Sequence, residues 1–324
     1  MTLANALDTA FCNAFPPATW RDVTVLLAVS GGPDSIAMLR AAAAARQPGP
    51  GKLAVIHFDH RWRAGSADDA QFVIDLCCRL EIPCMIGVGN PDKTDEAAAR
   101  NARLEFFCEQ ARSQGARYVL TAHTASDQVE TVLHRILRGT GLAGLTGIPR
   151  VRELVPGVAL LRPLLDVSRQ QTLEYLEQLG QPFRTDPTNA NTDYTRNRLR
   201  SELLPLLRDD FNPQVDQAVL RLVELAEGAQ EVVAAEAAEI LDAARRATAD
   251  NAISLDVQQL TTRSKFLACE ALLLAWKRQR WPLQEMGYAE WERIVEIAVA
   301  GGRAQFPGNV DVSSDGKTVQ LAKE

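Results

Sequence analysis

The sequence predicts an α/β fold, an open parallel five-stranded sheet with helices on both faces, joined to a mainly helical C-terminal domain. From about residue 20 to 165, short apolar β-rich runs alternate with segments of helical periodicity. Apolar strands spaced by helices are typical of parallel sheets that are covered on both faces. After about residue 165 helical patterns dominate, which predicts a second domain.

The expected elements of the first domain follow one another in strict alternation. The predicted strands are 23–29, 52–58, 82–88, 117–122 and 158–164. The predicted helices between them are 35–46, 67–80, 96–114 and 127–138. Ser66 followed by Asp69 predicts a capping box at the start of the second helix. Because ligands of open α/β sheets bind beyond the carboxyl ends of the strands, we expect the functional residues there.

The second half reads as helices with a terminal hairpin. A helix over 168–180 is expected, with Ser168 as N-cap and Gly180 at its C-terminal end. Residues 213–247 predict one long helix or two shorter ones, and further helices are expected at 264–280 and 288–300. The alternating end of the chain, around Ser-Asp-Gly, predicts the hairpin. We place the boundary at Asn212-Pro213, which gives a catalytic domain 1–212 and a C-terminal domain 213–324.

Composition narrows the class of protein. The chain has 324 residues, 46% of them apolar, and a net charge of −6, which argues against non-specific polyanion binding without excluding a local basic patch. No apolar run approaches the roughly 20 residues of a membrane helix, and no secretory signal is expected. The six cysteines show no C-x-x-C spacing, which favours a reducing cytoplasm over a disulfide scaffold. The oligomeric state stays open, a homodimer included.

The stretch Ser30-Gly31-Gly32-Pro33-Asp34-Ser35 has the form of an anion-binding turn. It follows a strand and opens a helix, where unpaired N–H groups and the positive end of the helix dipole favour a phosphate. Gly31 and Gly32 let the backbone approach phosphate oxygens, Pro33 suits the first helical turn, and Ser30 and Ser35 add hydroxyl donors. The lysine of a Walker-type loop is missing.

Asp34 is the informative residue of this turn. A carboxylate beside a polyphosphate is repulsive unless a cation lies between them, and Mg²⁺ binds one or two carboxylates together with phosphate oxygens. We therefore expect ATP bound with Mg²⁺, with Asp34 as a metal ligand through the nucleotide. The alternative is an ordinary capped helix, in which Asp34 stabilises the helix dipole.

The pattern S-G-G-x-D-S after a first strand resembles the PP-loop of the N-type ATP pyrophosphatases. The resemblance implies an adenine nucleotide alpha-hydrolase-like fold and cleavage of ATP between its α and β phosphates. It also implies transfer of AMP to a substrate oxygen, with pyrophosphate held by the loop.

Three further stretches are similar to tRNA(Ile)-lysidine synthetases. They are HFDHRWRAGSADDAQFV (57–73), TAHTASDQVETVLHRILRGTGLAGLTGIP (121–149), and LLRPLLDVSR (160–169) with RTDPTNANTDYTRNRLRSELLPLL (184–207). With the loop they cover about residues 23–207 in the family's order, and the chain resembles the short form. Thr124 replaces a family histidine, Ser126 a commonly acidic residue, and Arg61 and Trp62 replace a glycine and a leucine.

The resemblance implies a ligase that acts on a tRNA base. ATP would adenylylate the wobble cytidine of an isoleucine tRNA with a CAU anticodon, and the ε-amine of free L-lysine would then displace AMP to give lysidine. Since an amine with a pKa near 10.4 is almost fully protonated at pH 7, a positioned carboxylate should accept its proton. Asp127 is the expected acceptor and Glu130, one turn on, is expected to hold the amine. Dipole stabilisation and helix capping are their respective alternatives.

Histidines and arginines complete the expected site. His123 is expected among the catalytic residues and His60 at the nucleotide, since either could donate to a phosphate, although either could also be a structural histidine. Arg100 and Arg103, one turn apart on a helix, are expected to bind ATP, with a tRNA phosphate as the alternative. Without paired ligand spacing, the four histidines predict no zinc site.

The tRNA backbone is expected at Arg196, Asn197, Arg198 and Arg200, with a solvated helix face as the alternative. Three other classes remain open: a tRNA thiolase, which needs cysteines, an amide-forming ligase of small substrates, and a silent nucleotide-binding scaffold. The intact Asp34 with both glycines argues against the last.

Overall fold

We describe a computed structural model, which covers residues 5–62, 65–89, 96–185, 195–246 and 251–323. The chain divides into two compact units, Met1–Val223 and Glu224–Glu324. This division falls within the long helix α11 (Val215–Ala244), whereas the boundary expected from the sequence precedes that helix. No helix of the described residues has the length and apolar character to cross a membrane.

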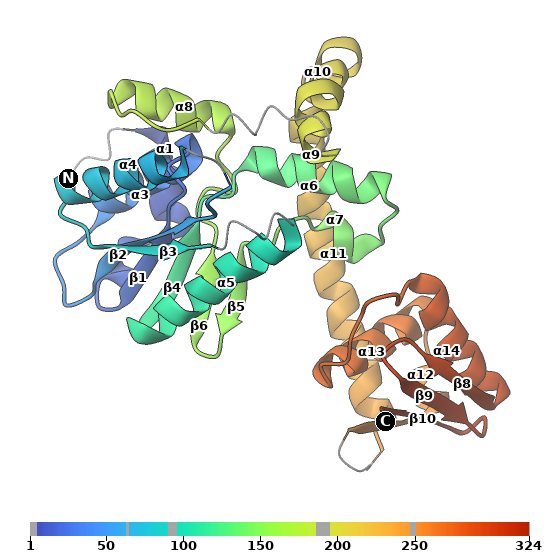
Figure 1. The fold of residues 1–324 in the computed structure, drawn as a ribbon. Helices are drawn as coiled ribbons and strands as arrows, with labels where there is room; N and C mark the ends of the chain where they lie inside the picture. Colours follow the sequence, from blue (N-terminus) through green and yellow to red (C-terminus); the bar gives the residue numbers. More distant parts are fainter. Residues whose placement is uncertain (1–4, 63–64, 90–95, 186–194, 247–250, 324) are drawn as a thin grey trace. The chain divides into compact units, whose positions relative to one another are not determined.

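The first unit is built on a six-stranded sheet with the order β3-β2-β1-β4-β6-β5 (Figure 1). Its strands are β1 (Thr24–Ala28), β2 (Leu53–Asp59), β3 (Cys84–Val88), β4 (Ala116–Thr121), β5 (Val151–Val155) and β6 (Val158–Leu161). The five strands expected from the sequence are all present and all parallel. The expected count of five is wrong, because β5 adds an antiparallel edge strand through the turn at Gly157. β5 is mostly exposed, so it lacks the apolar run that revealed the others.

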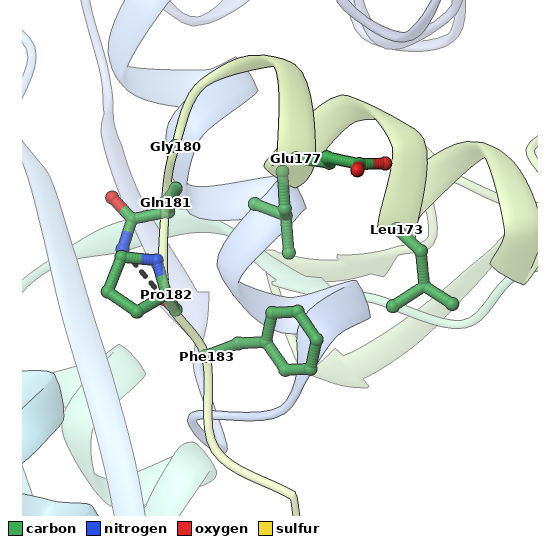
Figure 2. A pocket seen from close by; sticks show the side chains of 7 residues that line it. Leu173, Glu177, Gly180, Gln181, Pro182 and Phe183 are labelled. Carbon is green, nitrogen blue, oxygen red and sulfur yellow. Dashed lines mark hydrogen bonds between the residues drawn. The ribbon is translucent and has the colours of Figure 1, made fainter.

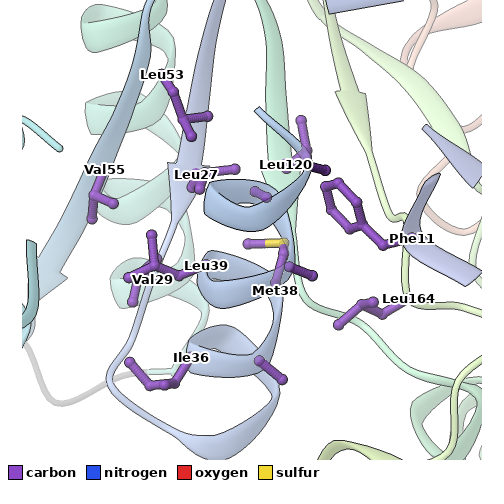
Figure 3. Packing of buried hydrophobic residues seen from close by; sticks show 14 of the residues in the cluster. Phe11, Leu27, Val29, Ile36, Met38, Leu39, Leu53, Val55, Leu120 and Leu164 are labelled. Atoms are coloured by element: carbon purple, nitrogen blue, oxygen red, sulfur yellow. The ribbon is translucent and has the colours of Figure 1, made fainter. Parts of the chain in front are cut away.

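Helices cover both faces of this sheet, as expected. They are α1 (Ala6–Ala14), α2 (Pro17–Trp20), α3 (Pro33–Ala45), α4 (Ser66–Arg79), α5 (Glu96–Ser113), α6 (Ala125–Leu137), α7 (Leu142–Leu145) and α8 (Arg169–Gln178). Successive residues of β1 enter different cores, one on each face of the sheet. Leu27 packs with Met38 of α3 and Phe11 of α1 (Figure 3), whereas Leu26 packs with Phe107 of α5 on the other face.

Two helix starts test the capping predictions. At α8, Ser168 is the N-cap and forms a capping box with Gln171, so that prediction is confirmed. At α4 the capping box of Ser66 and Asp69 is wrong, because Gly65 is the N-cap and no side chain caps it. The carboxylate of Asp69 instead accepts a hydrogen bond from Arg184 Nε at 2.9 Å. A tertiary ion pair has replaced the local interaction.

The first unit ends in irregular helical turns. They are α9 (Thr195–Arg198), the π-helical η2 (Leu199–Leu203), α10 (Leu204–Leu206) and the π-helical η3 (Leu207–Phe211). Pro205 has no N–H for a regular helical hydrogen bond, and π-helical turns flank the short α10 that contains it. Beyond them α11 runs as one helix, which decides between the one long and two short helices left open by the sequence.

The C-terminal unit contains more sheet than expected. After α11 come β7 (Ala252–Asp256), α12 (Val257–Leu260), α13 (Lys265–Arg278), α14 (Tyr288–Ala300), β8 (Gly302–Phe306), β9 (Val310–Ser314) and β10 (Thr318–Lys323). The expected hairpin is present as β9 and β10. It belongs to an antiparallel four-stranded sheet, β7-β10-β9-β8, which the sequence did not predict. The core of this unit surrounds the fully buried Trp276.

Candidate active site

Hydrogen bonds of its own two serines stabilise the turn between β1 and α3. The Ser35 hydroxyl donates to the Gly32 carbonyl at 2.9 Å and accepts from the Ser30 N–H at 3.1 Å. Gly31 has φ +91°, which a residue with a Cβ rarely adopts. Helix α3 begins at Pro33, with Gly32 as an N-cap that makes no side-chain cap. The turn therefore presents backbone at the N-terminus of a long helix, a geometry suited to an anion.

Asp34 joins this turn to helix α8. Its Oδ1 accepts a hydrogen bond from Thr172 Oγ1 at 2.6 Å, and its Oδ2 lies 3.6 Å from Arg169 Nη1. Burial raises the pKa of Asp34, while the bond from Thr172 and the charge of Arg169 oppose that rise. Asp34 is thus the residue at which the turn and the segment LLDVSR meet.

The segment that follows α8 also contacts the turn, through Arg184. The Arg184 N–H donates to the Gly31 carbonyl at 2.9 Å, and the Arg184 side chain pairs with Asp69 of α4. A Cβ at Gly31 would lie 3.7 Å from Arg184 Cγ. The position of the turn therefore depends on the chain beyond α8 as well as on α3.

The start of α6 presents two carboxylates. Thr124 is the N-cap and forms a capping box with Asp127, whose Oδ2 accepts from the Thr124 N–H at 2.8 Å. The neighbouring Ser126 Oγ accepts from the Arg169 N–H at 3.2 Å. Thr124 and Ser126, the two residues at the start of α6 that differ from the family pattern, therefore both have a structural role. Thr124 caps the helix, and Ser126 links it to α8 by a hydrogen bond.

Glu130, one turn along α6, pairs with Arg200 of η2. Arg200 donates from Nε to Oε1 at 2.6 Å and from Nη2 to Oε2 at 2.8 Å, a bidentate geometry. The same Nη2 lies 3.6 Å from Asp127 Oδ1. Burial raises the pKa of Glu130, and Arg200 acts against this rise. Arg200, expected to bind tRNA, therefore faces the two carboxylates expected to act on lysine.

His123 lies at the end of β4 in cationic surroundings. Burial, reinforced by the charges of Arg162, Arg103 and Arg100, lowers its pKa to about 4, although Asp127 acts in the opposite direction. The imidazole is therefore neutral at pH 7, and Thr121 Oγ1 lies 3.1 Å from its Nδ1. A neutral ring with Nδ1 as acceptor keeps its other N–H as a donor.

The end of β6 carries a buried arginine. Arg162 donates from Nη1 to the Pro149 carbonyl at 2.5 Å, and its buried Nε has no hydrogen-bond partner among the described residues. Burial and the charges of Arg152 and Arg100 lower its pKa to about 10. At pH 7 Arg162 is still charged, and it adds to the positive potential around His123.

Two further histidines belong to this region: His57 lies within β2, and His60 directly follows it. His57 is buried, with its Nδ1 2.8 Å from the Val29 carbonyl, and burial lowers its pKa. His60, one residue beyond β2, has its ring between those of Phe58 and Trp62, at centroid distances of 4.8 and 5.2 Å. Burial and the nearby Arg103 lower the pKa of His60. In both rings the shift favours the neutral form.

The expected residues thus gather at one edge of the sheet, beyond the carboxyl ends of β1, β2, β4 and β6. Arg198 differs, because it is exposed and pairs with Glu202 at 3.3 Å. Asn197 is half-buried, and the Arg196 side chain lies outside the described residues. Four residues of this edge were not predicted from the sequence: Arg162, Arg169, Thr172 and Arg184. Arg162 and Arg169 stand in the quoted motif LLRPLLDVSR and Arg184 begins the next one, so a signal existed for these three.

A magnesium ion with ATP fits this edge in its donor set. Asp34 supplies one half-buried carboxylate beside the anion-binding turn, and Mg²⁺ with a nucleotide needs one or two carboxylates plus phosphate oxygens. Among the described residues no group of three or more histidine, cysteine or acidic side chains has the arrangement of a self-sufficient metal site.

An apolar groove lies elsewhere, along the C-terminal half of α8 (Figure 2). It measures about 700 Å³ and is lined by Leu173, Leu176, Glu177 and Gly180–Phe183. Its one charged lining residue is Glu177. Its lining offers no cationic side chain for a phosphate, and the polar edge remains the candidate site.

Comparison with known proteins agrees with this location. The model of a family described as "PP-loop domain" matches residues 5–207, which include the turn, α6, α8 and Arg200. A solved structure of the U34-tRNA thiolase NcsA from Methanococcus maripaludis, with its [4Fe-4S] cluster, superposes with a TM-score of 0.58. That likeness covers 68% of this chain and 78% of the thiolase at 15% identity, so it shows the fold alone.

Relatives named tRNA(Ile)-lysidine synthase match over most of the chain. The protein of Rhodopirellula baltica is 31% identical over 94% of this chain and 91% of its own length. That of Nostoc sp. is 28% identical over 92% and 90%, respectively. That of Solibacter usitatus is 36% identical over 88% of this chain, and the chain covers 64% of its length, just under two thirds.

Proposed function

Because the chain belongs to the PP-loop family of tRNA(Ile)-lysidine synthases, we propose that it joins L-lysine to the wobble cytidine of an isoleucine tRNA with a CAU anticodon, at the expense of ATP. The observation that carries the proposal is the meeting of a phosphate turn and two carboxylates at one sheet edge. Arg200 pairs with Glu130 and lies 3.6 Å from Asp127, and its charge also reaches Asp34 of the turn.

The proposed reaction has two steps. The O2 atom of the cytidine attacks the α-phosphorus of ATP, the bond to the β-phosphate oxygen breaks, and pyrophosphate leaves. The ε-amine of lysine then attacks C2 of the base, the C2–O bond breaks, and AMP leaves with the electron pair. The amine loses its protons on the way, so the second step needs a proton acceptor.

The chain's residues have distinct tasks in this scheme. The turn Ser30–Ser35 holds the departing pyrophosphate through backbone N–H groups and hydroxyls. Asp127, whose Oδ1 is not used by the capping box, accepts a proton from the amine. Glu130 orients the amine and Arg200. Neutral His123 donates a hydrogen bond to a phosphate or adenylate oxygen, and Arg100 and Arg103 supply positive charge to the nucleotide.

Magnesium, when bound, neutralises charge on the polyphosphate, with Asp34 as its protein ligand. Thr172 holds the Asp34 carboxylate at one oxygen, which fixes where the other points. Arg169 lies near that second oxygen at 3.6 Å and balances its charge.

The tRNA backbone is proposed to contact the stretch from Arg196 to Arg200. Exposed Arg198 pairs with Glu202 at an i, i+4 spacing, an interaction of small net energy. Its guanidinium can exchange that carboxylate for a phosphate at little cost.

The decisive experiment incubates the protein with ATP, labelled lysine and an isoleucine tRNA transcript with a CAU anticodon. Label should enter this tRNA but not one whose wobble cytidine is replaced by uridine. Failure to label an intact substrate tRNA contradicts the proposal. As a second measurement, Asp34→Ala should abolish pyrophosphate release. Asp166→Ala, which removes an exposed carboxylate paired with Arg150, should leave it unchanged.

A tRNA thiolase is the nearest rival, and the cysteines argue against it. All six lie in the described part of the chain, and all are free thiols. Cys77 lies in the last turn of α4 and Cys84 starts β3, so both lie toward the end of the sheet opposite the phosphate turn. Residues 30–35, 121–130, 160–172 and 184–200 contain no cysteine.

A further inference from the structure

An exposed tryptophan stands at the ligand edge of the sheet. Trp62 follows β2 by three residues and has 44% of its surface exposed. The other four tryptophans are Trp20, Trp276, Trp281 and Trp291, and all are buried. The exposed part of this ring offers apolar area to a ligand at the edge of the sheet where the candidate site lies.

The backbone at this point is fixed in an unusual conformation. Arg61 has φ +56°, in the left-handed region that glycine favours. The Arg61 N–H donates to Asp59 Oδ1 at 2.8 Å, and this bond holds the turn. The turn therefore directs Trp62 at a cost in backbone strain, and such strain is concentrated at functional positions.

A ladder of aromatic rings, formed by Phe106, Phe58 and His60, packs against Trp62. Its ring lies 5.2 Å from that of His60 at an angle of 36°, and His60 meets Phe58 edge to face at 4.8 Å. Phe58 in turn packs against Phe106 of α5 at 5.7 Å. The lowered pKa of His60 favours its neutral form, so Trp62 packs against a stack of aromatic rings in which no charge is favoured.

The ladder is connected to the candidate site through one arginine. The charge of Arg103 affects the pKa of both His60 after β2 and His123 after β4. With β1 between them, these strand ends are separated by two strand spacings, about 10 Å. Trp62 thus stands on the rim of the site, within reach of the nucleotides that flank a base held inside it.

We propose that Trp62 is a stacking platform for an unpaired RNA base that neighbours the nucleotide entering the site. The inference rests on the proposed function, in which one base of the anticodon loop must leave its own stack. Sequence-tolerant stacking on aromatic rings is how proteins hold such unstacked bases. The neighbouring Arg61 adds a positive charge, and in a protein of net charge −6 stacking supplies affinity that bulk electrostatics does not.

Tryptophan emission gives the first test. Because Trp62 is the exposed one of five tryptophans, titration with a CAU anticodon stem-loop RNA should quench the solvent-exposed part of the emission. Trp62→Phe should remove that quenching. ATP alone should not produce it. Quenching by ATP and none by RNA would assign the ring to the adenine and overturn the proposal.

Affinity and salt dependence give the second test. Trp62→Ala should weaken stem-loop binding by about 5- to 150-fold, the range for loss of one base stack, and Trp62→Phe should retain most of the affinity. The slope of log affinity against log salt should stay unchanged in Trp62→Ala, because no phosphate contact is lost. In the comparison variant Arg198→Ala the slope should fall. An unchanged affinity of Trp62→Ala refutes the platform.

Abasic substitution identifies the base. Removing the base at one loop position should cost the wild type as much as Trp62→Ala does, and should cost the variant nothing further. Strict additivity at every loop position contradicts the proposal. RNA quenching without lysine transfer would count against the proposed function and support the platform. Normal lysine transfer with unaltered RNA affinity in Trp62→Ala would refute the platform alone.

Discussion

The Glu130–Arg200 pair makes the sharpest prediction about the site. The Glu130 side chain is 8% exposed and that of Arg200 35%, so Arg200→Met leaves a carboxylate buried without its partner. Breaking a fully buried pair costs about 3–5 kcal/mol, and the partial exposure of Arg200 places this variant near 3 kcal/mol at pH 8. The loss should appear in the free energy of unfolding of the full-length protein.

The sign of its pH dependence follows from the protons bound in each state. Burial raises the pKa of Glu130 and Arg200 counteracts the rise, so Arg200→Met raises that pKa further. In the variant the folded state then binds more protons than the unfolded state between the ordinary glutamate pKa and the raised one. Stability therefore falls as pH rises through this window, by at most about 1.4 kcal/mol per pH unit. The deficit relative to wild type should be smaller at pH 5 than at pH 8.

Urea denaturation across this pH range is the assay, read by hydrogen exchange at the amides of α6 so that the first unit is followed separately. The matched control is the double variant Glu130→Gln, Arg200→Met, in which no buried carboxylate remains to titrate. Asp127, Arg169 and Arg200 are the other charged groups that act on Glu130, and only Arg200 differs between wild type and the single variant. A deficit that is the same at both pH values, or equally pH-dependent in the double variant, refutes the reasoning.

Three further predictions concern the turn and its neighbours. Gly31→Ala should lose about 1–2 kcal/mol of stability and weaken ATP binding, because φ is +91° there, whereas Gly32→Ala, at φ −71°, should keep its stability in a thermal melt. Thr172→Val removes the 2.6 Å donor to Asp34 and so raises the pKa of that carboxyl; the acidic limb of pyrophosphate release should move to higher pH, and an unmoved limb contradicts the role of Thr172. His123 should titrate near pH 4 in a proton NMR experiment, with its resonance unchanged from pH 6 to 8; a midpoint near 6.5 would disprove its buried, cationic surroundings.

The parts of the fold that could be predicted share one property, a strong local pattern. The parallel strands are continuous apolar runs because both of their faces are buried. β5 could not be found this way, since an exposed edge strand with Arg152 and Glu153 resembles a loop. The four-stranded sheet of the second unit was missed for a related reason: β7 pairs with β10 and β8 pairs with β9, and no local pattern in β7 or β8 indicates these partners.

For the candidate site, the sequence could predict which residues lie at the ligand-binding edge of the sheet. It could not predict which of their side chains contact one another. Polar or ionisable residues shortly after a predicted parallel strand are expected where ligands bind. This rule was enough to place Asp34, His60, His123 and Asp127 at that edge. The sequence could not reveal that Arg200 faces Glu130, 70 positions away, because no local pattern encodes that contact. Thr172 gave no signal either, since a buried threonine inside a helix looks like any other until its hydroxyl is seen on Asp34.

Asp127 shows how a capping residue and a proton acceptor can be the same side chain. Its Oδ2 accepts from the backbone N–H and hydroxyl of Thr124, which fixes the orientation of the carboxylate at the helix start. Its Oδ1 is turned toward Arg200 at 3.6 Å, longer than a hydrogen bond, and so retains capacity to accept a proton. Helix capping and proton acceptance therefore use different oxygens of Asp127. The cap therefore serves the proposed chemistry, because it holds the second oxygen where the amine of lysine would arrive.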